Sequence, residues 1–272
     1  MPYSRAHYFV GFVLLVTIVG FWTSYFTEIG KVPLAFHVHA FTATTWVILV
    51  MAQSWSIHNR KKLLHRTVGK LSLFVFPFLI TGFVMIINVS AERFSTVESS
   101  GIMKLGPSFG IGMALAIVAY LLLYYKALNN RRTLHLHAGY MLATPLILFE
   151  SPFSRIMLRD MPATIFTGSQ GPQLILDAIV ISITLAVVFS LVVYLRNRKK
   201  NGPFLVAAIL MAVQAVAMAV AGDVEWMRNL FAAYGAVPAE ISLPTGFLLG
   251  ALISWLGWTG PIKKRKAMAP AQ

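Results

Sequence analysis

Six of the seven histidines lie near the ends of long apolar segments, and they are the residues best suited to chemistry. They form three pairs along the chain: His37 with His39, His58 with His65, and His135 with His137. An ionisable ring inside a membrane span is costly to bury, so it usually marks a ligand site or an ion or proton pathway. The pattern predicts ligand binding or proton transfer, but it does not name a substrate.

The elements that must hold these residues are membrane-spanning helices. The chain is 57% hydrophobic and 12% charged, with a mean hydropathy of +0.72. A spanning helix needs about 20 apolar residues, and segments near that length recur with nothing long enough for a soluble domain between them. We expect one all-α integral membrane domain over residues 1–272, with about eight transmembrane helices. Their expected ranges are 7–27, 33–57, 68–90, 106–126, 134–156, 173–195, 203–222 and 242–260.

The basic residues fall mainly in alternate loops, which fixes the expected topology. About 17 lie on one side of the predicted bundle and about 6 on the other, as the positive-inside rule describes. The larger group is Arg5, Arg60, Lys61, Lys62, Arg66, Lys70, Lys126, Arg131, Arg132, Arg196, Arg198, Lys199, Lys200 and 263–266. Both termini are therefore expected in the cytoplasm, and the net charge of +14 indicates contact with anionic lipid rather than nucleic acid.

Three segments depart from simple spans. The first apolar stretch lacks a small-residue cleavage site, so we interpret it as a retained helix rather than a removed signal. Pro145 lies inside the fifth predicted helix, where the missing backbone donor predicts a kink. The segment 223–240 is too polar to span, and we expect it at the outer surface with Trp226 and Phe231 at the lipid headgroups.

One face of the second predicted helix carries polar residues. Thr42, Trp46 and Gln53 follow His39 at offsets of three, seven and fourteen, which keeps the four on nearly one face. Lipid offers no hydrogen bond to an amide such as that of Gln53, so this face should meet other helices.

Two carboxylates, Glu150 and Asp177, are expected at roughly the depth of His39 on the outer side, with Arg155 about one turn beyond Glu150. Glu150, Arg155 and Asp177 with His39 could bind a cation, relay protons or hydrogen-bond a quinone head group. In the simpler interpretation Glu150 pairs with Arg155, Asp177 caps the sixth helix, and His39 forms a hydrogen bond with a neighbouring carbonyl.

The inner histidines suit a different ligand. His65 directly precedes the third predicted helix and His137 opens the fifth, so imidazoles from two separate helices could supply both axial positions of a b-type haem. Met141 is another soft candidate, and Gly69 would leave room for a macrocycle. In the simpler interpretation His58 and His65 are solvated members of a basic loop, and His135 is a bystander. The chain has no cysteine, so thiolate ligands are excluded.

Part of the chain, from about 33 to 156, resembles a group of bacterial multi-helix membrane proteins known mainly as domains of unknown function. The string that carries the resemblance is His37-x-His39, Trp46, Gln53, His65-Arg66-x-x-Gly69, His137-x-x-x-Met141 and Arg155. It implies a multi-pass protein of the bacterial inner membrane with these positions at its site, the C-terminal helices over 173–260 lying outside it.

The paired histidines are also distantly similar to b-type cytochromes of the ascorbate-reducible kind, which hold one haem near each face. This chain has only His37 and His39 on the outer side, both on one helix, so a second haem is not expected there.

We therefore expect a membrane redox protein. Its haem b would be held on the cytoplasmic side by His65 and His137, with Trp46 and Gln53 among the cofactor-binding residues. The outer layer of His39, Glu150 and Arg155 would be its quinone or proton site. The alternatives are a cation- or proton-coupled transporter or metal-binding protein that uses His39, Glu150 and Asp177, and a membrane assembly factor without chemistry of its own. The sequence does not predict the oligomeric state.

Overall fold

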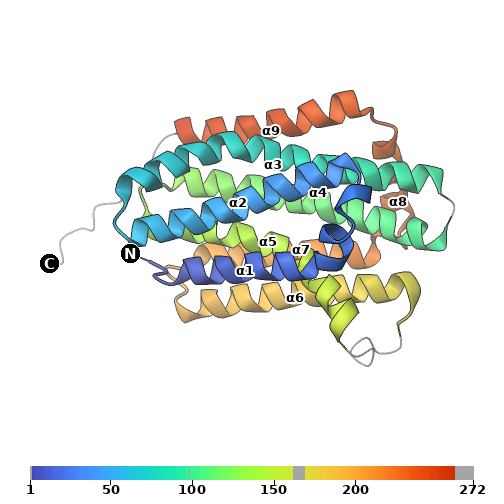
Figure 1. Cartoon of the computed structure of the whole chain (residues 1–272), viewed down its shortest axis with the longest axis horizontal. Helices are drawn as coiled ribbons and strands as arrows, with labels where there is room; N and C mark the ends of the chain where they lie inside the picture. The colour runs from blue at the N-terminus through green and yellow to red at the C-terminus, as the bar shows by residue number, and fades with distance from the viewer. Residues whose placement is uncertain (1, 98, 162–168, 261–272) are drawn as a thin grey trace.

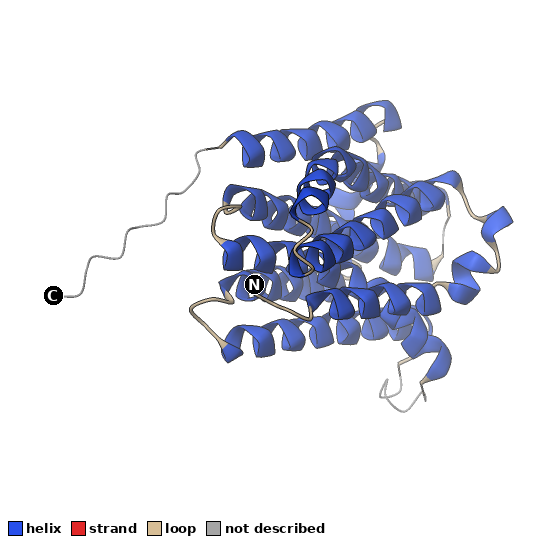
Figure 2. Cartoon of the chain, turned by 60° about the vertical axis from the view of Figure 1, so that its left-hand side comes forward, coloured by secondary structure: helices blue, strands red, loops and turns tan. Residues whose placement is uncertain are grey.

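The computed structural model describes residues 2–97, 99–161 and 169–260, and within them every regular element is a helix. The long helices pack side by side in an antiparallel bundle with short connections (Figures 1 and 2). The elements are α1 (Ala6–Gly20), the π-helix η1 (Trp22–Phe26), the 3₁₀ turn η2 (Ile29–Lys31), α2 (Leu34–His58), α3 (Lys62–Thr96), α4 (Ser100–Asn129), α5 (Leu134–Asp160), α6 (Gly171–Arg196), α7 (Gly202–Ala221), α8 (Glu225–Gly235) and α9 (Ala239–Thr259).

Seven of these helices, α2 to α7 and α9, are long and apolar enough to cross a membrane. The predicted all-α, multi-pass architecture is confirmed at this level. The start of α1 and the end of α9 lie at the same end of the bundle, the left-hand end of Figure 1. We call this end inner, after the predicted topology, and the opposite end outer. The basic cluster predicted at 263–266 lies outside the described residues.

The first predicted span is divided. Helix α1 has 15 residues, or about 22 Å of rise, which is short of a bilayer core. It is continued by η1, whose wider turn begins where the amide of Phe26 bonds to the carbonyl of Phe21. Within the described residues the structure shows seven span-length helices, and the eighth span stays a prediction.

Several helices are longer than their apolar cores. Helix α3 begins at Lys62 instead of residue 68, because the residues Lys62–Arg66 are good helix formers even where they are polar. His65 therefore lies in the first turn of α3, and the prediction that it precedes the helix is wrong. Helix α5 runs from Leu134 to Asp160 through both of its prolines.

Helix α8 confirms that the polar segment 223–240 does not span, but one of its predicted contacts is wrong. Trp226 is exposed as expected, whereas Phe231 is only 3% exposed. Its ring packs against Phe94 and occupies the space where a side chain at Gly110 would be. Phe231 thus anchors α8 in the bundle rather than at the headgroups.

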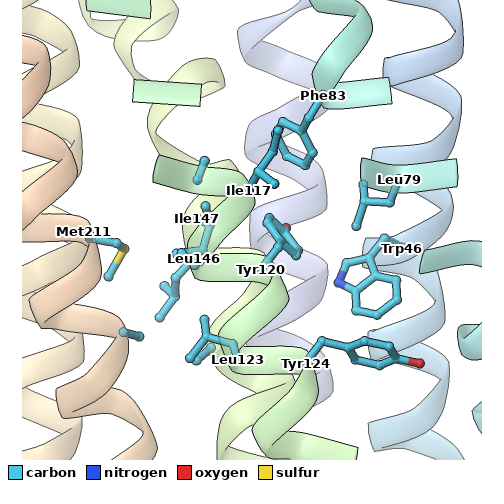
Figure 3. Close-up of a cluster of buried hydrophobic side chains, with 14 of the residues drawn as sticks. Trp46, Leu79, Phe83, Ile117, Tyr120, Leu123, Tyr124, Leu146, Ile147 and Met211 are labelled. Atoms are coloured by element: carbon cyan, nitrogen blue, oxygen red, sulfur yellow. The ribbon is translucent and has the colours of Figure 1, made fainter. Parts of the chain in front are cut away.

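Aromatic rings fill the middle of the bundle (Figure 3). Trp46 is fully buried, with ring centroids 5.3 Å from Phe76 and 5.1 Å from Tyr124. The indole Nε1 of Trp46 donates to Thr144 Oγ1 at 2.9 Å, so its one polar atom is satisfied. These contacts join α2, α3, α4 and α5 above the inner end.

Candidate functional site

A cavity of about 820 Å³ lies at the inner end of the bundle, where α2, α3, α4, α5 and α9 end or begin. Its lining brings together His65 and His137, which are 72 positions apart in the sequence. The other chemically capable residues along its wall are Gln53, His58, Arg66, Lys70, Arg131, Arg132, Met141 and Trp258.

Both imidazoles are held through the same ring nitrogen. His137 Nδ1 lies 2.8 Å from the carbonyl oxygen of Ala127, and His65 Nδ1 lies 3.3 Å from that of Gln53. A carbonyl only accepts, so each Nδ1 carries a proton, and in the neutral imidazole Nε2 then keeps its lone pair. Metal-ligating histidines commonly carry this backbone contact, which fixes the tautomer and the ring orientation.

Gln53 holds the helix turn that bears His65. Its side-chain Nε2 donates to the backbone carbonyl of His65 at 2.9 Å, while the backbone carbonyl of Gln53 accepts from the His65 ring. A Cβ at Gly69 would lie 3.4 Å from Gln53 Nε2. Gly69 lines the cavity as expected, but the room it leaves is used by the Gln53 amide. The predicted inward face of α2 is confirmed, since Gln53 is buried against α3.

The other two inner histidines are placed differently. His58 also lines the cavity, but its Nδ1 lies 2.6 Å from the Ser54 carbonyl and its Nε2 lies 3.2 Å from the Pro2 carbonyl. His135 lies edge-on to Tyr3, and it is not among the residues that line the cavity. Only His65 and His137 therefore combine a wall position with an Nε2 that no carbonyl engages.

Trp46, predicted at the cofactor, lies instead in a layer of core contacts next to the cavity. Pro145 deprives the Met141 carbonyl of its usual helical partner, and the hydroxyl of Thr144 donates to that carbonyl at 2.8 Å. Thr144 in turn accepts from Trp46. Met141 lines the cavity and Trp46 does not. The contacts of Trp46 are those of a core residue.

The cavity rim is strongly and uniformly cationic. Arg66, Lys70, Arg131 and Arg132 line it, and none of them is in an ion pair with a described carboxylate. Arg131 Nη1 also donates to the Gly257 carbonyl at 3.2 Å, which ties the end of α9 to this rim. The described acidic residues all lie in the outer half of the bundle: Glu28, Glu92, Glu150, Asp160, Asp177, Asp223, Glu225 and Glu240. Nothing in the described chain neutralises the rim, so it suits an anionic ligand.

At the outer end, the half-buried His39 and the buried Glu150 each have one buried polar atom without a hydrogen-bond partner among the described residues. His39 packs edge-on to Phe83, and its Nδ1 has no hydrogen-bond partner among the described residues. Glu150 is 8% exposed, and its Oε2 likewise has none. No hydrogen bond or ion pair joins His39, Glu150 and Arg155 in the described part of the chain.

The remaining outer residues have partners of their own. The Arg155 guanidinium donates to the Ser151 carbonyl and hydroxyl, both at 2.8 Å, and lies over the Phe21 ring. It forms no ion pair with Glu150 within 4.0 Å, so that simpler interpretation is wrong. Asp177 accepts from Ser169 and from Gln173, so it is satisfied near the start of α6. It does not cap this helix, whose N-cap is Gln170 and has no side-chain cap bond, so that part of the simpler interpretation is wrong.

One outer pair was missed by sequence reasoning. Tyr25 Oη lies 2.9 Å from His37 Nδ1. The two residues are 12 positions apart on either side of η2, so no helical spacing links them. Tyr25 lies in the π-helix η1, and π-helical turns often occur at functional positions. Hydropathy does not reveal such a turn, so the sequence analysis could not predict this pair.

No family model, curated protein or solved structure matches the chain. Among the described residues, no three histidine or carboxylate side chains gather closely enough to hold a metal ion on their own. A functional assignment must therefore rest on the inner cavity, the outer polar residues and their hydrogen bonds.

Proposed function

We propose that the protein is a membrane redox protein that binds one b-type haem in the inner cavity through His65 and His137. The observation that carries the proposal is that the two imidazole rings have the same hydrogen-bonding arrangement. Each donates its Nδ1 proton to a backbone carbonyl, each has an Nε2 with no hydrogen-bond partner among the described residues, and both residues line one cavity. Two neutral imidazoles from separate helices are an axial pair that suits a low-spin b-type haem.

The rest of the cavity suits the same group. Its volume, about 820 Å³, is within the range of cofactor sites. Val50, Leu63 and Leu142 offer apolar wall for the macrocycle, and the cationic rim offers partners for its two propionates. When bound, the haem would supply single-electron transfer. The protein side would fix the ring orientation through Gln53 and Ala127.

The topology belongs to the proposal as well. With α1 and η1 counted as one crossing, eight spans put both termini on the cytoplasmic side of a bacterial inner membrane. The haem would then lie near the cytoplasmic surface, within reach of a soluble electron donor or acceptor.

The test is haem content after expression with ample haem supply. We expect the purified protein to carry about one haem per chain, because both axial positions are filled. His65→Ala and His137→Ala should each lose most of it. Haem is measured by its pyridine adduct and protein by amino-acid analysis.

Two control variants make this test specific to ligation. His135→Ala removes a ring two positions from His137 that does not line the cavity, and His58→Ala removes a wall histidine whose nitrogens are both engaged. Both should retain haem. A colourless wild-type protein, or equal loss in all four variants, would contradict the proposal.

The buried carboxylate favours a second candidate function, proton- or cation-coupled transport. An unpaired carboxylate within a span is costly, and such residues often lie on ion pathways. In proteoliposomes with an imposed pH gradient, this function predicts proton or cation flux that Glu150→Gln abolishes. Flux that is absent from the wild type, or equal in the variant, would exclude it.

A further inference from the structure

The first residues of the chain lie against the inner end of the bundle before α1 begins. Pro2 is one of the residues that line the inner cavity, and its carbonyl oxygen lies 3.2 Å from Nε2 of His58, the last residue of α2. Figure 1 shows the start of the chain at this end. We call residues 2–4 the strap. Because Pro2 belongs to the cavity wall, moving the strap away removes part of that wall.

Tyr3 anchors the strap to the turn between α6 and α7. Its hydroxyl donates to Asn201 Oδ1 at 2.9 Å, and its ring packs edge-on to His135 and Phe204. Its backbone has a φ of 57°, a left-handed conformation that persists in a bulky residue only where contacts hold it. Burial raises the pKa of the Tyr3 phenol to about 12, so this anchor keeps its proton at any pH near neutrality.

His58 makes the second attachment of the strap, and it can do so in only one protonation state. Its Nδ1 lies 2.6 Å from the Ser54 carbonyl oxygen, and its Nε2 lies 3.2 Å from the Pro2 carbonyl oxygen. A carbonyl accepts and never donates, so both ring nitrogens must carry a proton for both bonds to form. The ring that holds the strap is therefore the imidazolium cation.

Loss of one proton from this ring must break one of the two bonds. The bond to Ser54 is the shorter one and lies within α2, four positions back, so it is the one that stays. The bond to Pro2 joins segments that are 56 positions apart. Without its proton, Nε2 turns a lone pair toward the Pro2 carbonyl oxygen and repels it. Deprotonation thus frees Pro2, while Tyr3 still holds the strap at Asn201.

No carboxylate among the described residues of the inner end faces His58. The proton on His58 is therefore stabilised by the two carbonyls and not by an ion pair. The tyrosines apart, the ionisable side chains next to His58 and on the cavity wall are bases: Arg5, His7 with its ring centroid 6.4 Å from that of His58, Arg60, Lys61, His65, Arg66, Lys70, Arg131, Arg132 and His137.

We propose that the strap controls entry to the inner cavity from the inner side of the membrane, and that protonated His58 is its latch. At low pH the latch is closed and the cavity is shielded, and as the pH rises the latch opens. The switch acts on the rate at which a molecule enters or leaves, so a latch-free variant can retain a bound ligand and still exchange it faster. Access alone is at issue, whichever ligand the cavity holds.

The chain has no cysteine, so one introduced thiol can report access to the cavity. Ser54→Cys places it on the cavity wall, at a residue that is 8% exposed. Dithiodipyridine forms a mixed disulfide with this thiol in the purified full-length protein, and the absorbance of the released pyridinethione gives the rate.

The rate is compared between the wild-type strap and His58→Met, whose side chain is similar in size and has no donor. Measurements are made at about pH 5 and about pH 8, either side of the range in which histidine usually changes charge. The ratio of the two rates at each pH cancels the pH dependence of the thiol itself.

We expect the reporter at pH 5 to react about tenfold faster in His58→Met than with the wild-type strap, the effect of losing one hydrogen bond to a charged group. At pH 8 the two rates should agree within about twofold, because the wild-type latch is then open as well. Tyr3→Phe should raise the rate at both pH values, since the bond that it removes does not titrate in this range.

Ser190→Cys is the matched control. Like Ser54, Ser190 is a buried serine whose hydroxyl has no hydrogen-bond partner among the described residues, but it lies on α6 outside the cavity. It should stay unreactive with every strap. Equal acceleration of both reporters in His58→Met would show general loosening and overturn the proposal. So would a ratio for Ser54→Cys that is the same at both pH values, or a Ser54→Cys thiol that reacts in no variant.

Bound haem can shield the reporter, so haem is measured by absorbance in every sample. The set is also repeated in the presence of His137→Ala, which the haem proposal expects to leave the cavity empty. A pH-dependent ratio on that background supports the strap even if the wild-type protein is colourless, and its absence there overturns the strap even if the wild type binds haem.

Discussion

At the residue scale, the histidines differ in what their ring nitrogens contact. The sequence predicts that His65 and His137 share one end of the molecule, because loop charge and helix boundaries place both residues on the cytoplasmic side. It does not predict the Nδ1 contacts to Gln53 and Ala127, since those depend on how helix ends meet. It also misses the contact of Tyr25 with His37, which depends on a local π-turn.

Trp46 provides a residue-scale prediction, because it was expected at the cofactor and lies in the core. Trp46→Phe removes the hydrogen bond to Thr144 and leaves a small void. We expect it to lower the free energy of unfolding by about 1–3 kcal/mol. Haem content should stay at the wild-type value. Thermal unfolding and absorbance on the same sample check both. Selective loss of haem without loss of stability would instead put Trp46 at the cofactor.

At the element scale, the sequence predicts which segments are helices better than it predicts where they end and how closely they pack. The length of each apolar segment identifies the spans. Polar helix formers extend α3 to Lys62, however, and a hydropathy profile does not detect such an extension. Hydropathy also does not predict where the backbones of two helices come into close contact. A Cβ at Gly20 of α1 would lie 2.2 Å from the carbonyl oxygen of Pro152 in α5. Pro152 and Gly20 thus bring the two backbones into direct contact.

Gly20→Ala should therefore separate α1 from α5. No flexible side chain can yield at this contact, so we expect destabilisation of about 1–3 kcal/mol, the usual cost of overpacking. Gly11→Ala on the same helix is the matched control, because its nearest neighbour is Met51 Sδ at 3.6 Å, an ordinary contact. Thermal unfolding in detergent compares the two. Equal midpoints for both variants would show that α1 and α5 do not pack in this way.

At the scale of the whole molecule, the charges are sorted between the two ends. The described acidic residues occupy the outer half, and the cationic rim lies at the inner end. Positive residues at one end both orient the chain in the membrane and attract an anionic ligand. The sequence predicts the topology for this reason, and the orientation of the bundle in the membrane stays a prediction. The cavity could not be predicted, because its wall comes from helices that are far apart in the chain.

The absence of native cysteine allows a direct test of the eighth crossing. Ser4→Cys and Thr27→Cys place single thiols just before α1 and just after η1. A membrane-impermeant maleimide should label Thr27→Cys in spheroplasts and Ser4→Cys only after the membrane is opened. Labelling of both from the same side would show that α1 and η1 do not cross.

The central claim, that His65 and His137 together bind one iron, is tested most directly by electron paramagnetic resonance of the oxidised, purified protein. Two imidazole ligands predict a low-spin ferric signal. In His65→Ala or His137→Ala this signal should vanish or be replaced by a high-spin one, and in His135→Ala it should remain. A wild-type protein with no haem signal, or with a signal that neither substitution changes, would contradict the account.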